Sequence, residues 1–484
     1  MIKRSFFRKV GFGIGPGQAV PEDPLAWAQA QVEKVPALSW KGDIPTGAAL
    51  FDNYAEWVYQ DRKVLRERHK TDRRAYRAAK DALRQKVGER FHENLELAIR
   101  HDAAINSGAP VFERLWWFWC NHFAITEKDF MPEFTTGPYH REIIRTRLCG
   151  SFAELATAVT TSWAMIHNLD NSESVGPNSK WGQNRRKRGQ PATVNENHAR
   201  ELLEIHTVSP AAGYGQDDVI ALSYVMAGWE HPHSKTRLEC NPVKFNQKKH
   251  EPGDHKVLGK TYKQRGITPE NKLLDALKDL SAHPSTREFI AFKLCRHFIT
   301  DHPSEAMMLP IIDAWANSNG HLPKVHAALL KVAYDHADRT EKFQNPEVWL
   351  MQMVNMTGAA WPPAPQHMNY DNVKGPTKVQ RAPSGWMREI GLSPYRPKQP
   401  NGWPDTMPEW VSSELLIRRL AFSQKLTSSR FFNRDLSLDA MVRANFDDAD
   451  AVRAFLNLDG DAMGTPRKID AVQQLFPSRW MLLA

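Results

Sequence analysis

The pattern of hydrophobic and polar positions along the chain predicts helices in most segments. Residues 23–35 open with Asp-Pro, a helix-capping pair, and apolar side chains follow at helical spacing. Residues 111–123 are apolar nearly all round, which predicts a buried helix. Residues 51–105 are polar and rich in Arg and Lys, with acids interspersed among the bases. This mixture predicts a pair of solvated helices linked by ion pairs, the alternative being a dedicated anion-binding face.

Strand signals are few, so the predicted fold class is mainly α. Residues 244–262 have the pattern of a short hairpin, but strands do not alternate with helices as they do in a parallel α/β sheet. We therefore expect a large multi-helix globular protein with at most a small β-hairpin. Residues 172–192 combine Gly, Pro and Asn with the basic run Arg185-Arg186-Lys187-Arg188, which predicts a loop.

Composition along the chain indicates three parts. Residues 1–360 are predicted to form the main helical domain, which contains most of the motifs described below. Residues 361–407 are rich in proline and polar groups and are predicted to be a connection. Residues 408–484 are predicted to form a helical C-terminal segment that packs on the main domain.

The overall charge permits an anionic or polar ligand and does not require one. The formal net charge is +9 and the pI is about 9.2, which permits an anionic partner. The chain has no zinc-finger, helix-turn-helix or RNA-binding signature, so no nucleic-acid partner is expected. Hydrophobic residues make up 41% of the chain and charged residues 25%, which indicates a folded rather than a disordered protein.

Cysteine usage and the N-terminus predict a cytoplasmic protein. The four cysteines are scattered without a CxxC pair, which is typical of a reducing compartment. Lys3 and Arg4 are followed by a glycine-rich stretch and not by the apolar run of about 7–15 residues that an export signal requires. We therefore expect no signal peptide and retention of residues 1–16. No apolar run approaches the roughly 20 residues that cross a bilayer, so no membrane span is expected.

Short motifs of aromatic, histidine and acidic residues occur in a recognisable order along the chain. They are Phe12-Gly13, Phe118-Trp119-Cys120-Asn121-His122-Phe123, the segment 195–207 (NENHARELLEIHT), Gly213-Tyr214, Gly228-Trp229, His250-Glu251, Lys293-Leu294, His297-Phe298 and Gly402-Trp403-Pro404-Asp405. In this order the motifs resemble the bacterial family known as domain of unknown function 1800. The resemblance covers nearly the whole chain. It implies a shared architecture and a set of special positions, and it implies no reaction.

The helix predicted to begin at Asn195 contains the first candidate site. Its polar residues lie on neighbouring faces: Glu196, Arg200 and Glu204, spaced four apart, with Asn197, His198 and Glu201 beside them. One interpretation is a surface ladder of ion pairs. The other is a cleft in which crowding of the carboxylates raises one carboxyl pKa and supplies an acid/base group. The same carboxylates with His198 would also suit a divalent metal ion.

Two further regions contain candidate histidines. Asn121 and His122 end the predicted buried helix. One interpretation is structural, with hydrogen-bonded side chains that order the end of the helix in the core. The other is functional, with Asn121 binding substrate and His122 acting as a general base. The second region holds five potential zinc ligands in no standard spacing, the alternative being a polar surface loop. These ligands are His231, His233, Cys240, His250 and His255, of which His250 falls on a motif position.

Two functions fit these candidates. The first is an acid/base or metal-assisted hydrolase acting on a polar substrate. Its catalytic groups would be His122, Glu196, Arg200, Glu201 and Glu204, with Asn121, Asn197 and His250 binding substrate and His198 or His250 binding a metal. The alternative is a non-catalytic binding or assembly partner whose polar motifs are structural. The hydrolase requires convergence in space, so His122 is predicted to lie close to the Glu196–Glu204 face.

Overall fold

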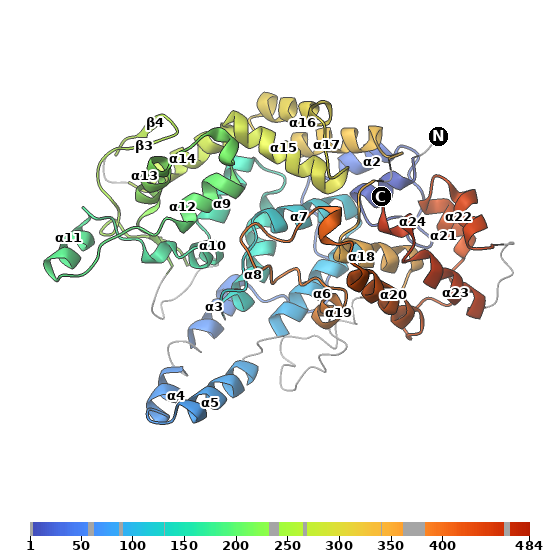
Figure 1. Ribbon diagram of the computed structural model, residues 1–484, viewed down its shortest axis with the longest axis horizontal. Coiled ribbons are helices and arrows are strands. Elements are labelled where there is room, and N and C mark those ends of the chain that lie inside the picture. The colour runs from blue at the N-terminus through green and yellow to red at the C-terminus, as the bar shows by residue number, and fades with distance from the viewer. Residues whose placement is uncertain are drawn as a thin grey trace.

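The computed structural model describes the chain except for residues 1–2, 57–61, 87–90, 130, 232–241, 265–268, 340, 362–382 and 459–464. In this described part, helices dominate and the strands form two small antiparallel sheets (Figure 1). The prediction of a mainly α protein is therefore confirmed. Among the described helices, none is long and apolar enough to cross a membrane.

The strands lie in and next to the segment predicted to form a hairpin. β3 (His255–Val257) and β4 (Lys260–Tyr262) make that hairpin. Its turn contains Leu258 and Gly259, both with positive φ, as a tight two-residue turn requires. A second ribbon joins β1 (Trp229–Glu230) to β2 (Lys244–Phe245).

One apolar core runs through most of the molecule and combines helices from both ends of the chain. The N-terminal and C-terminal helices lie side by side, as the contacts of α1 with α21 show (Figure 1). The helices that contribute to this core are α1 (Ser5–Val10), α2 (Pro24–Ala30), α6 (Phe91–Asn106), α7 (Pro110–His122), α9 (Phe152–Thr160), α10 (Trp163–Asn168), α15 (Pro284–Phe298), α16 (Glu305–Ser318), α17 (Leu322–Asp335), α18 (Pro346–Thr357), α19 (Pro383–Glu389), α20 (Ser413–Thr427), α21 (Leu438–Asn445), α22 (Ala449–Phe455), α23 (Thr465–Leu475) and α24 (Arg479–Leu482).

A smaller core lies at the other end of the molecule, between α12 (Asn197–Glu201), α13 (Gln216–Met226), α14 (Asn271–Ala282) and the β3–β4 hairpin. The backbone N–H of Leu258 donates to Asp218 Oδ1 over 2.7 Å, which fastens the hairpin to α13. The remaining elements are α3 (Gly47–Glu56), α4 (Arg62–Arg68), α5 (Arg73–Lys86), α8 (Pro132–Pro138), α11 (Lys180–Lys187), the π-helices η2 (Tyr139–Ile144) and η5 (Leu202–His206), and the 3-10 turns η3 (Arg145–Arg147), η4 (Asn171–Glu173), η6 (Pro210–Ala212) and η10 (Met407–Glu409).

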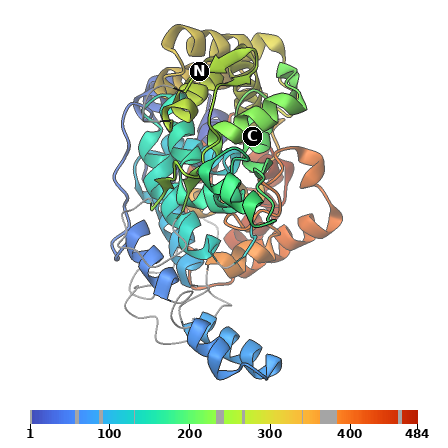
Figure 2. The same cartoon turned by 90° about the vertical axis from the view of Figure 1, so that its left-hand side faces the viewer.

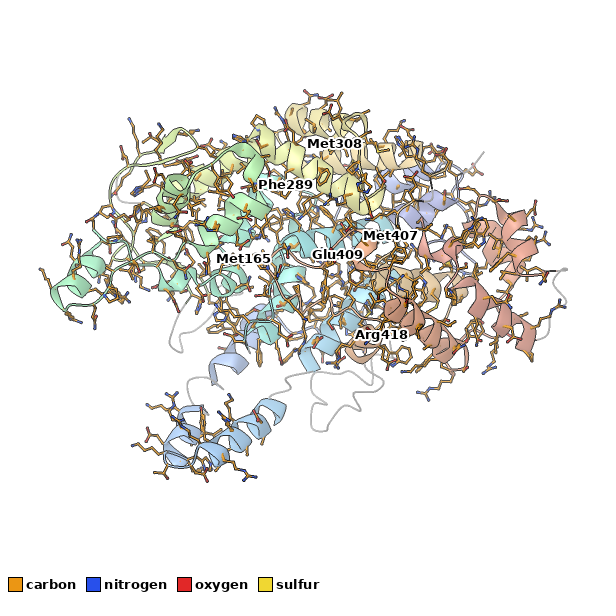
Figure 3. All side chains as sticks on the ribbon, in the orientation of Figure 1. Met165, Phe289, Met308, Met407, Glu409 and Arg418 are labelled. Carbon is orange, nitrogen blue, oxygen red and sulfur yellow. The ribbon has the colours of Figure 1, made fainter. Side chains whose placement is uncertain are left out.

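Helix α7 is enclosed on all sides, which confirms the predicted buried helix. Every residue from Val111 to Cys120 is buried, and side chains of the surrounding helices fill the space around it (Figure 3). Two of its three buried indoles have polar partners, whereas Trp117 Nε1 has none among the described residues. Trp116 Nε1 donates to the His140 carbonyl over 2.8 Å, and Trp119 Nε1 donates to His326 Nε2 over 3.0 Å.

Buried arginine–glutamate pairs join the elements around α6 and α7. They are Arg100–Glu347 at 2.8 Å, Arg141–Glu96 at 2.7 Å and Arg145–Glu113 at 2.7 Å. His101 Nε2 also donates to Glu347, because its Nδ1 accepts from Trp361 Nε1 over 3.1 Å. Burial raises the pKa of the Glu347 carboxyl, but Arg100 and His101 more than offset it and leave that pKa below its ordinary value.

One prediction about local structure is confirmed in part and another is wrong. Within residues 51–105, α4 and α5 contact each other and project from the body as a solvated pair, whereas α6 is buried (Figures 1 and 2). Within the described side chains of α4 and α5 the only ion pair is Glu67–Lys70 at 3.6 Å, so the predicted linkage by ion pairs stays a prediction. Residues 180–187 form α11 and not a loop, because Ser179 Oγ accepts from the Gly182 N–H and caps the helix.

The connection predicted over 361–407 is described only in part. Residues 362–382 lie outside the described residues. After them come α19 and a segment without regular structure, which carries Gly402 to Asp405 back to the end of α7.

Loss of the buried carboxylate of Glu347 is expected to destabilise the fold strongly. Glu347→Ala leaves Arg100 buried without its counter-ion, which costs about 3–5 kcal/mol in the free energy of unfolding. Glu414→Ala removes the partner of Arg418 from an exposed pair and should cost less than about 1 kcal/mol. Urea denaturation of both variants measures the difference, and equal costs would contradict a stabilising role for the buried pair.

Candidate functional site

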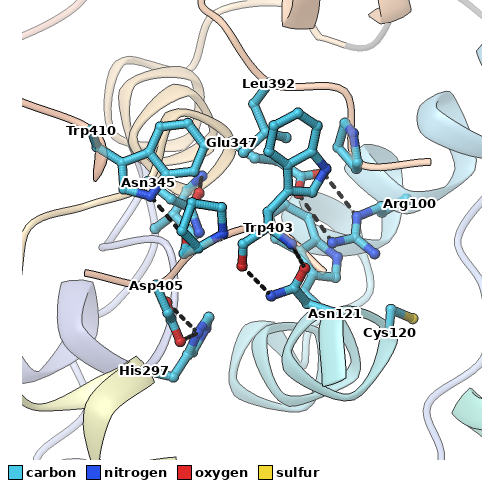
Figure 4. A pocket seen from close by; sticks show the side chains of 14 residues that line it. Arg100, Cys120, Asn121, His297, Asn345, Glu347, Leu392, Trp403, Asp405 and Trp410 are labelled. Carbon is cyan, nitrogen blue, oxygen red and sulfur yellow. Dashed lines mark hydrogen bonds and ion pairs between the residues drawn. The ribbon is translucent and has the colours of Figure 1, made fainter. Parts of the chain in front are cut away.

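The C-terminal end of α7 holds a distant segment of the chain through Asn121. Its Nδ2 donates to the Trp403 carbonyl over 2.9 Å, and its Oδ1 accepts from the Trp403 N–H over 2.8 Å (Figure 4). Gly402 has a φ of +79°, and a Cβ there would lie 2.4 Å from the Asn121 carbonyl oxygen. Only glycine combines this backbone conformation with so close an approach.

A small pocket lies where this segment meets α6, α7, α15 and α18 (Figure 4). Its free volume is about 40 Å³, enough for about three water molecules. Polar and aromatic side chains line it together: Arg100, Trp117, Cys120, Asn121, His297, Asn345, Glu347, Trp403, Asp405 and Trp410, with Val348, Leu392, Pro394 and Pro404.

His297 and Asp405 form a hydrogen-bonded pair at the wall of this pocket. His297 Nδ1 lies 3.0 and 2.9 Å from the two carboxylate oxygens of Asp405 (Figure 4). Nδ1 therefore carries the proton that Asp405 accepts. His297 Nε2 is buried and has no hydrogen-bond partner among the described residues. Burial lowers the pKa of His297, and the opposing effect of Asp405 only partly restores it, so the ring is neutral with a free lone pair on Nε2.

Asp405 is surrounded by cationic groups. The Lys342 ammonium donates to the Asp405 carbonyl and to Asp301 Oδ1, the latter over 2.7 Å. Burial raises the pKa of the Asp405 carboxyl, but His297, Lys342 and Lys293 outweigh it and leave the pKa below its ordinary value. Asp405 is therefore a carboxylate at neutral pH.

His122 belongs to a second polar group next to this pocket. Its Nε2 donates to the His206 carbonyl over 3.2 Å, and its Nδ1 accepts from Lys293 Nζ over 2.9 Å. Burial, then the neighbouring Lys293 and His206, lower the pKa of His122 well below its ordinary value. Burial also lowers the pKa of Lys293, to about 8, against the influence of Asp405. Lys293 and His297 are one turn apart on α15, so that helix joins the two groups.

The carboxylates of the NENHARELLEIHT segment take no part in the contacts of His122 that the structure describes. Glu196 pairs with Arg200 at 3.0 Å, and Arg200 also donates to Gln216. In the described residues, no hydrogen bond or ion pair joins His122 to Glu196, Glu201 or Glu204. His122 instead contacts the last residue of the π-helix η5, so closeness to the carboxylate face stays a prediction.

The other positions assigned from the sequence are also dispersed. Burial, then the neighbouring Glu204, raise the pKa of the half-buried Glu201. Asn197 is exposed, and its backbone N–H donates to Asn195 Oδ1. His250 Nδ1 donates to the Ala227 carbonyl over 2.8 Å. None of these residues lines the pocket described above.

The candidate metal ligands are not gathered. His198 is fully buried with neither ring nitrogen hydrogen-bonded, and burial lowers its pKa to about 3. Burial likewise lowers the pKa of His250, to about 4. His233 and Cys240 lie outside the described residues. Within the residues that are described, no group of three or more His, Cys, Asp or Glu side chains is placed to hold a metal ion.

A family model for proteins of unknown function, DUF1800, matches residues 5–477. The chain belongs to the DUF1800 family. No curated protein and no solved structure matches it significantly. The match spans every motif quoted from the sequence, and the structure of this DUF1800 protein brings several of them together. Asn121, His297 and the segment from Trp403 to Asp405 line one pocket. The hydrogen-bonded pair of His122 and Lys293 follows Asn121 on α7 and precedes His297 by one turn of α15.

The pairing of His297 with Asp405 in this DUF1800 chain is not predicted by the sequence. Both stand in motifs that carry the resemblance, yet 108 residues separate them and neither has a telling neighbour in sequence. The sequence feature that could have indicated this pair is the presence of a histidine in one motif and of a single acidic residue in another, Gly-Trp-Pro-Asp. Local spacing cannot show that these two side chains meet, because the loop after α19 brings them together.

Replacing Gly402 by alanine is expected to damage the pocket of this DUF1800 protein. The new Cβ would clash with Asn121, so Gly402→Ala should cost roughly 2–4 kcal/mol in the free energy of unfolding. Gly213 has a similar φ of +72° and open space around it, so Gly213→Ala isolates the backbone strain at about 1–2 kcal/mol. Thermal or urea unfolding measures both. If the free energy of unfolding falls by the same amount in both variants, the close approach of Gly402 to Asn121 does not contribute to stability.

Proposed function

We propose that the pocket catalyses hydrolysis of a small polar substrate, with His297 as general base. The observation that supports this is the orientation of His297. Asp405 accepts from Nδ1, and Nε2 has no partner among the described residues in a histidine that lines the pocket. A histidine oriented by a partly buried carboxylate, with a lone pair left on its second nitrogen, is the arrangement that general-base catalysis requires.

The chemistry follows from the charges of the site. Neutral His297 accepts a proton at Nε2 from a water molecule as the water oxygen attacks the substrate, and the Asp405 carboxylate stabilises the imidazolium that forms. The imidazolium then returns this proton to the leaving group as the bond to that group breaks. Arg100 uses Nε and Nη2 for Glu347, which leaves Nη1 as a donor for negative charge that develops on the substrate. Roles for the surface carboxylates or for a metal ion are not needed in this scheme.

The size of the pocket restricts the substrate. About 40 Å³ holds a few waters and not a drug-sized molecule, so the reacting part of the substrate must be small. The lining combines indole rings with Arg100 and Asn345, which suits a compact polar group more than a long apolar chain.

A non-catalytic role is the second candidate, and the pairing of the site residues favours it. Both polar atoms of the Asn121 side-chain amide are hydrogen-bonded to Trp403, and Lys342 donates to Asp301 and to the Asp405 carbonyl. In this case the pocket would be only the site where hydrogen bonds hold the segment 402–405 to α7 and α15. Variants would then lose stability and would have no activity to lose.

The two candidates are separated by a substrate panel of small chromogenic esters, amides and phosphoesters. We expect turnover by the wild-type protein and a loss of about 10²–10⁴-fold in kcat in His297→Gln. His336→Gln replaces a histidine on α17 that donates to the Val332 carbonyl outside the pocket, and it should retain full activity. Circular dichroism checks that both variants are folded. Unchanged turnover in a folded His297→Gln variant, or none in the wild type, would reject the hydrolase.

The dependence of rate on pH tests the roles of the pair. The active form of His297 is neutral, so the rate should fall as pH drops through its pKa, with a midpoint below about 6.5. Asp405 raises this pKa while burial, Arg114 and Lys342 lower it. Asp405→Asn should therefore move the midpoint to lower pH and reduce the plateau rate.

Asp335→Asn is the matched control for this experiment, because it removes one negative charge from an exposed pair with Lys331. The control should leave the midpoint in place. A midpoint that rises in Asp405→Asn, or that moves equally in both variants, would show that Asp405 does not act on the base.

A further inference from the structure

Helix α11 concentrates positive charge on the surface. Residues 180–190 contain five basic side chains and no acidic one: Lys180, Arg185, Arg186, Lys187 and Arg188. Arg185 is half-buried and the other four are exposed. Arg185 and Arg186 donate to backbone carbonyls, of Pro191 and Pro177 respectively, and Arg186 also donates to Asn178. No ion pair within the described residues neutralises any of the five.

Hydrogen bonds and close packing fix the position of α11 on the rest of the described structure. Asn178 just before it donates its backbone N–H and its Nδ2 to the buried carboxylate of Glu251, over 2.8 and 2.6 Å. The Trp181 N–H donates to the Lys248 carbonyl over 2.9 Å. A Cβ at Gly182 would lie 2.2 Å from the Gly176 carbonyl oxygen, so helix and loop are in close contact. The basic helix is therefore presented in a fixed orientation.

One large aromatic side chain is exposed among these cations. Trp181 is 41% exposed, and the Lys249 ammonium lies 5.3 Å from the centre of its ring. An exposed indole between basic groups has an apolar surface and a hydrogen-bonding N–H, which suits the boundary between polar headgroups and acyl chains.

Helix α11 is also the outermost element at one end of the long axis of the molecule (Figure 1). The view onto that end shows α11 facing the viewer (Figure 2). Nitrogen-tipped side chains project outward from it (Figure 3). A helix at this extremity of the described chain is placed where it can meet a flat surface.

We propose that α11 docks the protein onto an anionic lipid surface, with Trp181 inserted at the headgroup level. Clusters of four to eight Lys and Arg side chains on a helix bind acidic lipids in this way. Single-stranded nucleic acid would require a groove with several stacking rings, and α11 is convex with one exposed ring. A protein partner would require an apolar contact centre larger than a single indole.

The test uses the full chain and two kinds of vesicle, pure phosphatidylcholine and an equal mixture of phosphatidylcholine and phosphatidylglycerol. We expect co-sedimentation with the mixed vesicles only, weakened by added salt. The triple variant Arg185→Gln, Lys187→Gln, Arg188→Gln should bind roughly 100-fold more weakly, at about five-fold for each charge lost. It leaves Arg186 and its hydrogen bonds to the loop in place.

Two further variants make the test specific. Trp181→Ala keeps every charge and should weaken binding roughly ten-fold through loss of the indole anchor. Arg73→Gln, Arg74→Gln, Arg77→Gln removes the same charge from the exposed surface of α5 and should leave binding unchanged. Failure to bind the mixed vesicles, equal weakening by the α5 variant, or binding to a single-stranded oligonucleotide in place of the vesicles would each overturn the proposal. Activity of the pocket plays no part in these outcomes.

Discussion

The burial of α7 on all sides is the constraint on which the rest of the structure depends. A helix with indoles and phenyl rings on every face cannot lie on a surface, so other helices must surround it. These helices come from both ends of the chain, which is why α1 and α18 to α24 share one core with it. Charged groups at the edge of this core, such as Arg100 and Glu347, are stable there only because they are paired.

The polar end of the same helix creates the site. Asn121 and His122 reach the core boundary still needing hydrogen bonds, and each obtains them from a distant segment. Asn121 fixes the loop that carries Asp405, and Asp405 then orients His297 from α15. The pocket thus forms because the polar end of a buried helix obtains its hydrogen bonds from distant segments. The position of the His297–Asp405 pair depends on the side-chain amide of Asn121.

The sequence predicts the fold class and the buried helix well, because both follow from local patterns of apolar residues. It predicts the site only in part. The sequence predicts substrate binding by Asn121. This residue lines the pocket, but its side-chain amide is hydrogen-bonded to the backbone of Trp403. The spacing of the carboxylates around Glu201 predicts that they share neighbouring faces of one helix. Spacing along one helix does not determine which helix lies opposite that face. The meeting of His297 with Asp405 requires the long loop after α19, whose path no local pattern determines.

Unpaired buried nitrogens alone do not identify a candidate base, as a comparison of His297 with His198 and His206 shows. His198 and His206 leave both ring nitrogens without hydrogen bonds among the described residues. Burial lowers the pKa of both, so neither ring is charged, and no carboxylate selects a tautomer. His297 differs because Asp405 fixes its proton on Nδ1 and because it borders a water-sized pocket. A base needs a defined lone pair and a place for the proton donor, and within the described part of the chain His297 has both.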